Sequence, residues 1–137
     1  MNAAELLTNI ATHYNAFLRT SAHKQALTRS QALLLLNVPY DGITMSELAF
    51  RLGIDNSTLT RNVDKLILLD LVTKKRANND KRIIKILITD NGKFVLNKIE
   101  VFLNNFNLHL IDKLDIDNQN KIIELLEKIA WSMHCLR

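Results

Sequence analysis

Apolar residues recur at helical spacing near both ends of the chain. In residues 3–20 one face carries Leu6, Ile10, Tyr14 and Phe17. Residues 94–114 predict a second helix, about 30 Å long. After a break at residues 115–117, a last helix has one apolar stripe: Ile122, Leu125, Leu126, Ile129, Met133 and Leu136. The first helix could fold back on its own chain or pair with a second copy, and we expect the three helices to pack together between two chains.

Three helices in the middle of the chain begin with polar caps. Two follow the capping-box pattern, in which Ser or Thr precedes Glu or Gln by three positions: Thr28 with Gln31, and Thr44 with Glu47. The first of these helices contains the apolar run 32–36, which we expect to be buried, and the second ends at Gly53. Asp55 caps the third helix, predicted to run to about residue 71. Because Asp55 follows Gly53 so closely, the second and third helices should meet at a steep angle.

Two segments rich in β-branched residues follow these helices. Residues 72–76 and 82–88 predict two strands, joined by a turn at residues 77–80. Thr89 then caps the next helix. Two closely spaced helices followed by a basic hairpin are the pattern of a winged helix-turn-helix, whose DNA-binding form places its second helix in the major groove.

The helix that Asp55 caps has an outward face suited to nucleic acid. Leu59, Val63 and Leu66 form its core side. The opposite side is small and polar near the N-terminus, with long cations behind it, so it can approach base edges. Together with basic residues of the hairpin, this face gives the candidate DNA-binding set: Asn56, Ser57, Thr60, Arg61, Lys65, Lys74, Arg76, Lys81 and Arg82.

The positive charge of the chain is concentrated in the same segment. The 137 residues carry a net charge of +4, yet residues 51–93 alone hold ten basic and five acidic side chains. A surface that faces a phosphate backbone is expected to look like this, although an ordinary solvated basic face would share the feature. With 47% apolar residues, 3 Gly and 1 Pro, the sequence predicts one mostly helical globular domain.

The order and spacing of these motifs resemble the MarR family of bacterial transcriptional regulators over nearly the whole chain. The matching segments are Leu27-Thr28-x-x-Gln31, Ser46-Glu47-Leu48-Ala49-x-x-Leu52-Gly53-Ile54, Asp55-x-Ser57-Thr58-Leu59-Thr60-Arg61-x-Val63-Asp64-Lys65-Leu66, Leu71-Val72, Asp80-x-Arg82 and Ile88-Thr89-x-x-Gly92. The resemblance implies a single domain, residues 1–137, in which a winged helix-turn-helix lobe at 27–92 lies between dimerisation helices at 1–26 and 93–137. The chain departs from the family pattern at Asp70, where Gly is usual, and in the wing turn, which lacks the common proline.

The resemblance also implies how the chain acts. Two copies intertwine their terminal helices, each lobe places its second motif helix in a major groove, and each wing tip enters the flanking minor groove. By position, Arg82 is the minor-groove arginine, Asp80 orients it, and Ser57, Thr60 and Arg61 face the bases. A guanidinium is weakly hydrated and suits a narrow, electronegative groove; an ordinary turn Asp and surface Arg are the alternative. The implied function is a homodimeric repressor on pseudo-palindromic double-stranded DNA.

Many members of the family release DNA when a small phenolic or anionic molecule binds between the dimer helices and the lobe. His13 and Tyr14 could line such a cleft here, or they could be packed interface residues. Cys135 does not match the reactive position of the family's peroxide-responsive branch, and an idle thiol is favoured over a redox sensor. The four histidines show no metal-ligand spacing, so we expect neither a metal nor a cofactor.

Other functions fit the sequence less well. It has no phosphate-cradling glycine loop, no Ser-His-Asp arrangement and no paired carboxylates in apolar surroundings, so we expect no enzymatic activity. A winged helix that docks proteins would expose several large apolar residues on its second helix, where only Leu68 is of that kind. A winged-helix regulator without a small-molecule ligand stays open. The longest apolar run has five residues and no signal peptide is visible, which predicts a cytoplasmic protein with no membrane partner.

Overall fold

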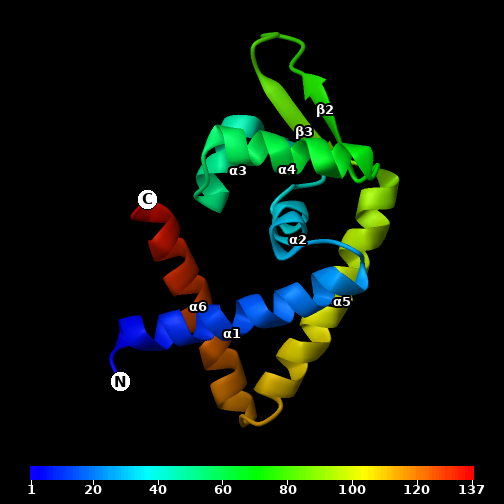
Figure 1. Cartoon of the computed structure of the whole chain (residues 1–137). Coiled ribbons are helices and arrows are strands. Elements are labelled where there is room, and N and C mark those ends of the chain that lie inside the picture. Colours follow the sequence, from blue (N-terminus) through cyan, green and yellow to red (C-terminus); the bar gives the residue numbers. More distant parts are fainter. The chain divides into compact units, whose positions relative to one another are not determined.

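The computed structural model covers residues 1–137 and contains six helices and three strands (Figure 1). In chain order the elements are α1 (Ala3–Lys24), α2 (Arg29–Leu36), β1 (Ile43–Thr44), α3 (Met45–Leu52), α4 (Asn56–Leu68), β2 (Val72–Arg76), β3 (Ile84–Ile88), α5 (Asp90–Ile111) and α6 (Ile116–Cys135). The predicted mostly helical fold with a small β wing is confirmed. The chain forms two compact units, Met1–Leu103 and Asn104–Arg137.

Polar side chains cap the helices largely as the sequence predicts. At the start of α2 both bonds of the capping box form: Thr28 Oγ1 accepts from the Gln31 N–H at 3.2 Å, and Gln31 Oε1 accepts from the Thr28 N–H at 2.9 Å. The second predicted capping box is only half right. Thr44 Oγ1 accepts from the Glu47 N–H at 3.2 Å, but the Glu47 carboxylate pairs with Arg51 one turn later at 3.1 Å. A guanidinium within reach competes for that carboxylate more strongly than a backbone amide does.

Three tight backbone positions set how the elements of the first unit meet. Gly53 ends α3 in the left-handed conformation, with φ of 63°, and Asp55 begins the cap of α4 immediately afterwards. Asp70 has φ of 57° at the position where the family pattern has Gly. Asp adopts this left-handed conformation more readily than most residues with a Cβ do. Gly92, in the first turn of α5, packs against Leu71, the residue that precedes β2. A Cβ at this position would lie 2.0 Å from the Leu71 carbonyl oxygen. Only glycine allows α5 to start so close to that strand.

The wing belongs to a three-stranded antiparallel sheet in the order β1-β3-β2. Ile43 of β1 pairs with Ile86, and Val72 of β2 pairs with Ile88. The sequence did not predict β1, because two residues give no periodic signal. The predicted second strand was also wrong at its first two positions, since Arg82 and Ile83 lie in the loop before β3. There the Asp80 carboxylate accepts from the Arg82 N–H at 3.0 Å, which turns the chain away from the ladder.

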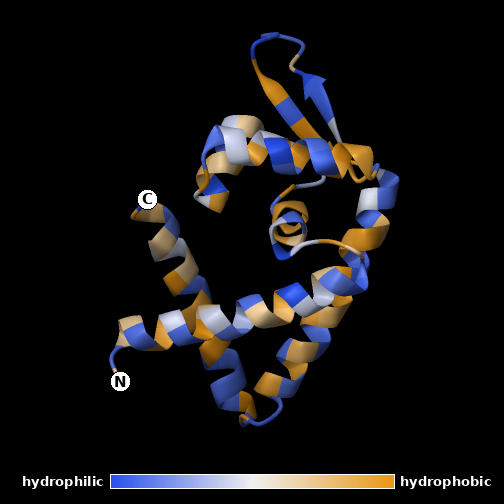
Figure 2. Cartoon of the chain, in the orientation of Figure 1, coloured by the Kyte–Doolittle hydropathy of each residue, from blue (hydrophilic) through white to orange (hydrophobic).

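The apolar core of the first unit forms where α2, α3 and α4 meet the sheet. In Figure 1, α2 lies between α1 and α4, and both neighbours contact it. Figure 2 shows β3 mostly apolar and β2 mostly polar, as expected when one central strand faces the core. Side chains with no exposed surface define this core: Leu34, Leu35, Leu48, Leu59, Val63, Leu66, Ile86 and Ile99. The core holds α4 and the base of the wing as one body.

The predicted apolar stripes on α1 and α6 are largely uncovered. In α1 only Leu18, Ser21 and Ala22 are buried, all in its last two turns. Its first turns expose the stripe Leu6, Ile10, Tyr14 and Phe17. In α6 no residue is buried, and the exposed apolar side chains include Ile122, Leu125, Leu126, Ile129, Trp131 and Met133. None of the helices has the length and apolar character that crossing a membrane requires.

Candidate nucleic-acid interface

The face of α4 away from the core is polar along its length. Leu59, Val63 and Leu66 are buried beneath it, as predicted. Asn56, Ser57, Arg61 and Lys65 are exposed, whereas Thr60 is half-buried. The Thr60 hydroxyl donates to the Asn56 carbonyl at 2.8 Å, so its oxygen can still accept hydrogen bonds. The exposed set therefore combines two small polar side chains at the N-terminus with two cations further along.

Asp55 fixes the N-terminus of α4. Its carboxylate accepts from the Thr58 N–H at 2.7 Å and from the Thr58 hydroxyl at 3.0 Å. These two bonds, and then the charge of Arg61, lower the pKa of the Asp55 carboxyl below its usual range. The carboxylate is charged at neutral pH and caps the first turn of α4. This cap fixes the backbone from which the outward side chains of that turn project.

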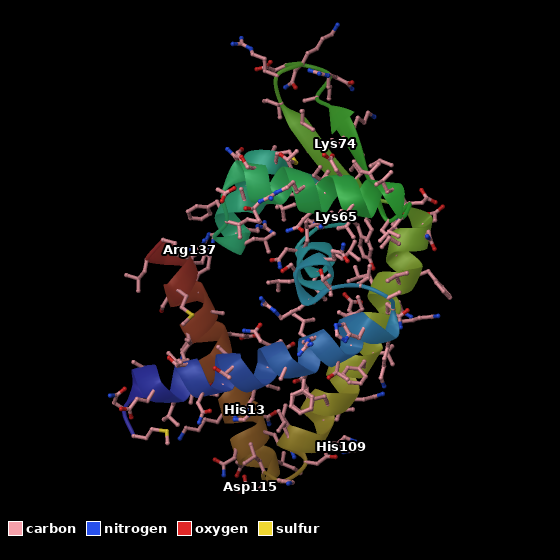
Figure 3. The ribbon with its side chains drawn as sticks, in the orientation of Figure 1. His13, Lys65, Lys74, His109, Asp115 and Arg137 are labelled. Atoms are coloured by element: carbon pink, nitrogen blue, oxygen red, sulfur yellow. The ribbon has the colours of Figure 1, made fainter.

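An ion pair joins β2 to the flank of α4. Lys74 Nζ lies 3.0 Å from Asp64 Oδ1, and both groups are partly exposed. In Figure 3, Lys74 on β2 and Lys65 on α4 lie on the same side of the lobe. Lys74 was predicted as a DNA contact from its charge alone. The structure gives it a carboxylate partner, which partly neutralises it and makes it a brace between the wing and α4.

The wing tip presents one arginine and secures it with a carboxylate. The Arg82 side chain is 95% exposed, and its Nε lies 3.5 Å from Asp80 Oδ1. The same oxygen accepts from the Arg82 backbone N–H at 3.0 Å. Arg76 Nη1 donates to the Lys81 carbonyl at 2.7 Å and so ties the end of β2 across the loop. Arg76 is engaged within the wing, whereas Arg82 and the exposed Lys81 face outward.

A hollow of about 430 Å³ lies between the N-termini of α3 and α4 and the wing. Of the predicted residues, Asn56, Thr60 and Arg82 line it together. The lining also includes Thr44 and Ser46, whose oxygens lie 3.4 Å apart. Sequence reasoning missed these two, because their position depends on the pairing of β1 with β3. Adjacent hydroxyl residues at the start of α3 were the available signal.

The candidate ligand residues lie elsewhere in the first unit. His13 and Tyr14 are exposed on α1, where Figure 3 labels His13, and neither lines the hollow. Cys135 is a free, exposed thiol at the end of α6. In the last turns of the same helix, the rings of Trp131 and His134 pack at a tilt, with centroids 5.8 Å apart. The structure contains no group of three or more His, Cys, Asp or Glu side chains that could hold a metal ion.

Comparison with known proteins identifies this arrangement. Residues 27–83, which span α2, α3, α4, β2 and the wing loop, match the family model described as MarR family. Over this segment the chain matches the MarR family. It is 29% identical over 108 residues to the uncharacterized HTH-type transcriptional regulator YhbI of Bacillus subtilis (strain 168), a match that covers 78% of this chain and 68% of the relative. It is 28% identical over 106 residues to the HTH-type transcriptional regulator TcaR of Staphylococcus aureus (strain Newman), covering 74% and 69%.

Solved structures share the fold of this chain. The structure of a mutant MarR from E. coli complexed with operator DNA superposes with a TM-score of 0.73 at 23% identity, over 92% of this chain and 91% of that one. In this family frame α3 and α4 are the helix-turn-helix, and β2 and β3 with their loop are the wing. The chain is thus similar in sequence to HTH-type transcriptional regulators and in fold to MarR. That it catalyses no reaction stays a prediction.

Proposed function

We propose that this chain is a homodimeric repressor of the MarR family that reads an inverted repeat in double-stranded DNA. Each protomer inserts α4 into a major groove and the wing tip into the flanking minor groove. The observation that carries the proposal is the common hollow lined by Asn56, Thr60 and Arg82, because it joins the polar end of α4 to the wing arginine. The operator complex of the E. coli MarR mutant supports the same use of the fold.

The α4 face suits base recognition. Asn56 and Ser57 are short and exposed beside the helix N-terminus, so the backbone can come close to base edges. Arg61 and Lys65 follow at the spacing that brings side chains round one face of a helix. Leu68, 86% exposed, is the large apolar exception, and it lies at the opposite end of α4. A protein-docking face would place such residues centrally.

The wing suits a minor groove. Arg82 is exposed, and its Nε has one contact with the Asp80 carboxylate, at 3.5 Å, while the same carboxylate accepts from the Arg82 backbone N–H. A pre-positioned guanidinium loses less side-chain entropy on binding, and a narrow minor groove attracts it. Asp80 therefore has the orienting role that the sequence resemblance implies, and Arg82 the contacting role.

A second copy of the chain is the partner that the terminal helices need. The α6 helix has 20 residues and buries none of them, although it carries six or more large apolar side chains. A helix of this kind is marginal in water by itself, and exposed apolar surface of this extent marks an interaction site. Together with the exposed stripe of α1, it supports the homodimer and the division into lobe and dimerisation helices.

The effector belongs to the same proposal. A small phenolic or anionic molecule that binds beside His13 and Tyr14 would release the DNA by favouring a different spacing of the two lobes. Both side chains are exposed on α1 and therefore accessible to a ligand. Regulation by protein abundance, without a ligand, is the alternative.

Arg82→Ala tests the wing. It should weaken binding to specific and random duplexes by the same factor and reduce the slope of log K against log salt by about one unit. Lys113→Ala removes an equal charge from the turn after α5 and serves as the control. Fluorescence anisotropy over a salt series measures both. If Arg82→Ala and Lys113→Ala give the same slope as the wild type, Arg82 does not contact DNA.

A further inference from the structure

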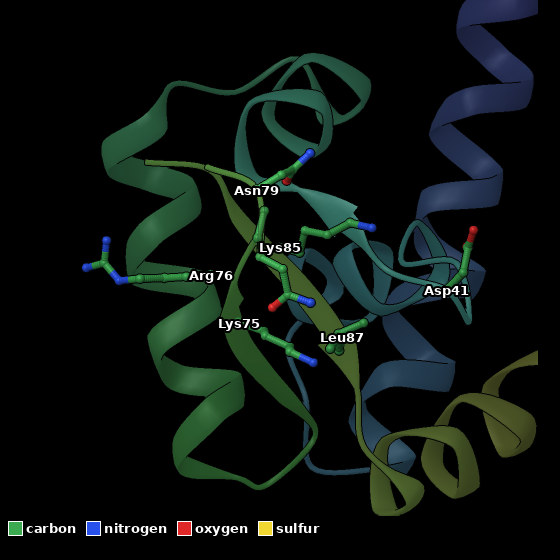
Figure 4. A pocket seen from close by; sticks show the side chains of 8 residues that line it. Asp41, Lys75, Arg76, Asn79, Lys85 and Leu87 are labelled. Carbon is green, nitrogen blue, oxygen red and sulfur yellow. The ribbon is translucent and has the colours of Figure 1, made fainter. Parts of the chain in front are cut away.

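A second hollow lies on the other face of the wing, away from α4. Its volume is about 360 Å³, and Lys75, Lys85, Asn78 and Asn79 line it together with Asp41 (Figure 4). Alternation along β3 separates the two faces of the sheet: Ile86 and Ile88 are buried toward the core, so Lys85 points the opposite way. In Figure 4, Lys75 and Lys85 share this outer face while Arg76 points to the other side.

Two lysines face each other across the strands in this hollow. The register pairs Lys75 of β2 directly with Lys85 of β3. Like charges in that position destabilise a sheet. Neither lysine forms an ion pair, although the neighbouring Lys74 has Asp64 as a partner. Asp41 is the one carboxylate in the lining, against two ammonium groups. The outer face of the wing therefore keeps uncompensated positive charge in a concave site.

We propose that this outer wing site, made by Lys75 and Lys85 with the amides of Asn78 and Asn79, binds the phosphate backbone of DNA beyond the half-site. The inference rests on the proposed function. The minor groove is about 6 Å wide, with a phosphate strand along each side. A wing tip inserted there with Arg82 has one strand on the α4 side and the other beside its outer face. Lys75 and Lys85 lie one register pair below the end of the ladder. Under this proposal they lie beside that outer strand.

Such a site contributes affinity without sequence preference. Lysine binds phosphate as a point charge, and each neutralised phosphate adds about 0.9 to the salt slope. Two lysines should therefore add nearly two units. The like-charge repulsion across the strands is relieved when each ammonium group binds a phosphate. The contact lengthens the footprint outward on both ends of a two-fold operator.

The double variant Lys75→Gln/Lys85→Gln tests the outer wing site. The probe is a duplex selected by the wild-type protein from a randomised pool. Between about 50 mM and about 200 mM salt, the wild type should lose roughly tenfold more affinity than the double variant. The loss should be equal on the selected duplex and on a scrambled one. Lys113→Gln/Lys121→Gln, with the same change of charge, is the control and should keep the wild-type slope.

Shortening the duplex gives an independent readout. When the base pairs outside the half-sites are removed, the wild type should weaken to the affinity of the double variant, and the double variant should lose nothing further. Equal losses for both proteins, or an unchanged slope in the double variant, would overturn the outer wing site. A wild type that binds no duplex would instead overturn the proposed function, so the two failures are distinguishable.

Folding of the variants is controlled by thermal melting. Removal of the repulsion between Lys75 and Lys85 should leave the melting temperature of the double variant at or above that of the wild type. If the double variant melts lower, Lys75→Gln alone is used, because that side chain is exposed. It should reduce the salt slope by about one unit, and no reduction would contradict the proposal.

Discussion

The winged lobe buries its core apolar side chains, whereas the last helix exposes its apolar side chains. In the lobe, Leu34, Leu59, Val63 and Ile86 have no exposed surface. In α6, of similar apolar content, no residue is buried. The lobe is thus complete as a folded body and carries the polar surface that we propose meets DNA. The α6 helix leaves its apolar side chains uncovered within one chain, and we therefore propose recognition for the lobe and assembly for α6.

The largest effect is expected from substitutions in α1 and α6, the helices proposed to form the dimer. Ile10→Asp combined with Leu126→Asp would place four carboxylates in each dimer interface, and burial of unpaired charge costs several kcal/mol per group. We expect monomers or aggregates by size-exclusion chromatography with light scattering, at every concentration tested. Thr12→Asp with Asn120→Asp adds the same charges on other positions of α1 and α6 and should leave the dimer intact. A well-behaved dimer with Ile10→Asp and Leu126→Asp would remove α1 and α6 from the interface.

A core substitution in the lobe should come next in size. Leu59→Ala opens a cavity beneath α4 and should lower the free energy of unfolding by about 2–5 kcal/mol. The loss should not depend on protein concentration, since the lobe core lies within one chain. Leu125→Ala on α6 should give a loss that grows on dilution. Urea denaturation at two protein concentrations compares them, and the same concentration dependence for both variants would contradict the division.

A smaller effect concerns two residues with a left-handed backbone, Ala26 after α1 and Asp70 in the lobe. Ala26 has φ of 56°, which costs a residue with a Cβ about 1–2 kcal/mol. Ala26→Gly should therefore stabilise the protein by about 1 kcal/mol, and Asp70→Gly by less, because Asp tolerates this conformation. Ala16→Gly in the interior of α1 should destabilise by about 1 kcal/mol. Urea midpoints measure the three changes, and a loss of stability in Ala26→Gly would contradict the backbone geometry.

The smallest effect is the pH dependence of the α4 cap. The hydrogen bonds from Thr58 lower the pKa of Asp55 in the folded protein. A carboxyl with a lowered folded pKa stabilises the fold above its unfolded pKa, and this contribution is lost as the pH falls through the folded value. The urea midpoint of the wild type should exceed that of Asp55→Ala at pH 7 and approach it below about pH 4. A constant difference down to pH 3 would show that the charge of Asp55 plays no part.

What the sequence predicted were features decided within a few residues. Thr28 and Asp55 each cap a helix through a bond to a residue three positions on. Asp115, where the sequence indicated only a break, caps α6 in the same way. Gly53 and Thr89 end or begin helices for equally local reasons. The outward face of α4 was predicted from the helical spacing of the apolar residues on its core side. These contacts depend on the chain's own neighbours, so a pattern of residue types is enough to indicate them.

The features that the sequence did not predict depend on distant residues. The two residues of β1 become a strand only because β3 lies beside them. Lys74, a predicted DNA contact, also has an ion-pair partner, Asp64, ten positions earlier in the chain. Arg76 is held by the Lys81 carbonyl. The pairing of Lys75 with Lys85 needs the register of the hairpin, which its irregular loop sets. A count of charges along the sequence does not distinguish the lysines and arginines that have partners in the fold from those that have none.

The central claim is that two lobes read DNA through α4 and the wing at a fixed separation. Selection of tight binders from a randomised duplex pool, at physiological salt, tests it most directly. The account predicts recovery of an inverted repeat whose half-sites lie about one helical turn apart. Recovery of unrelated or merely AT-rich duplexes would contradict it, because such binding would need neither the α4 face nor the two-fold assembly.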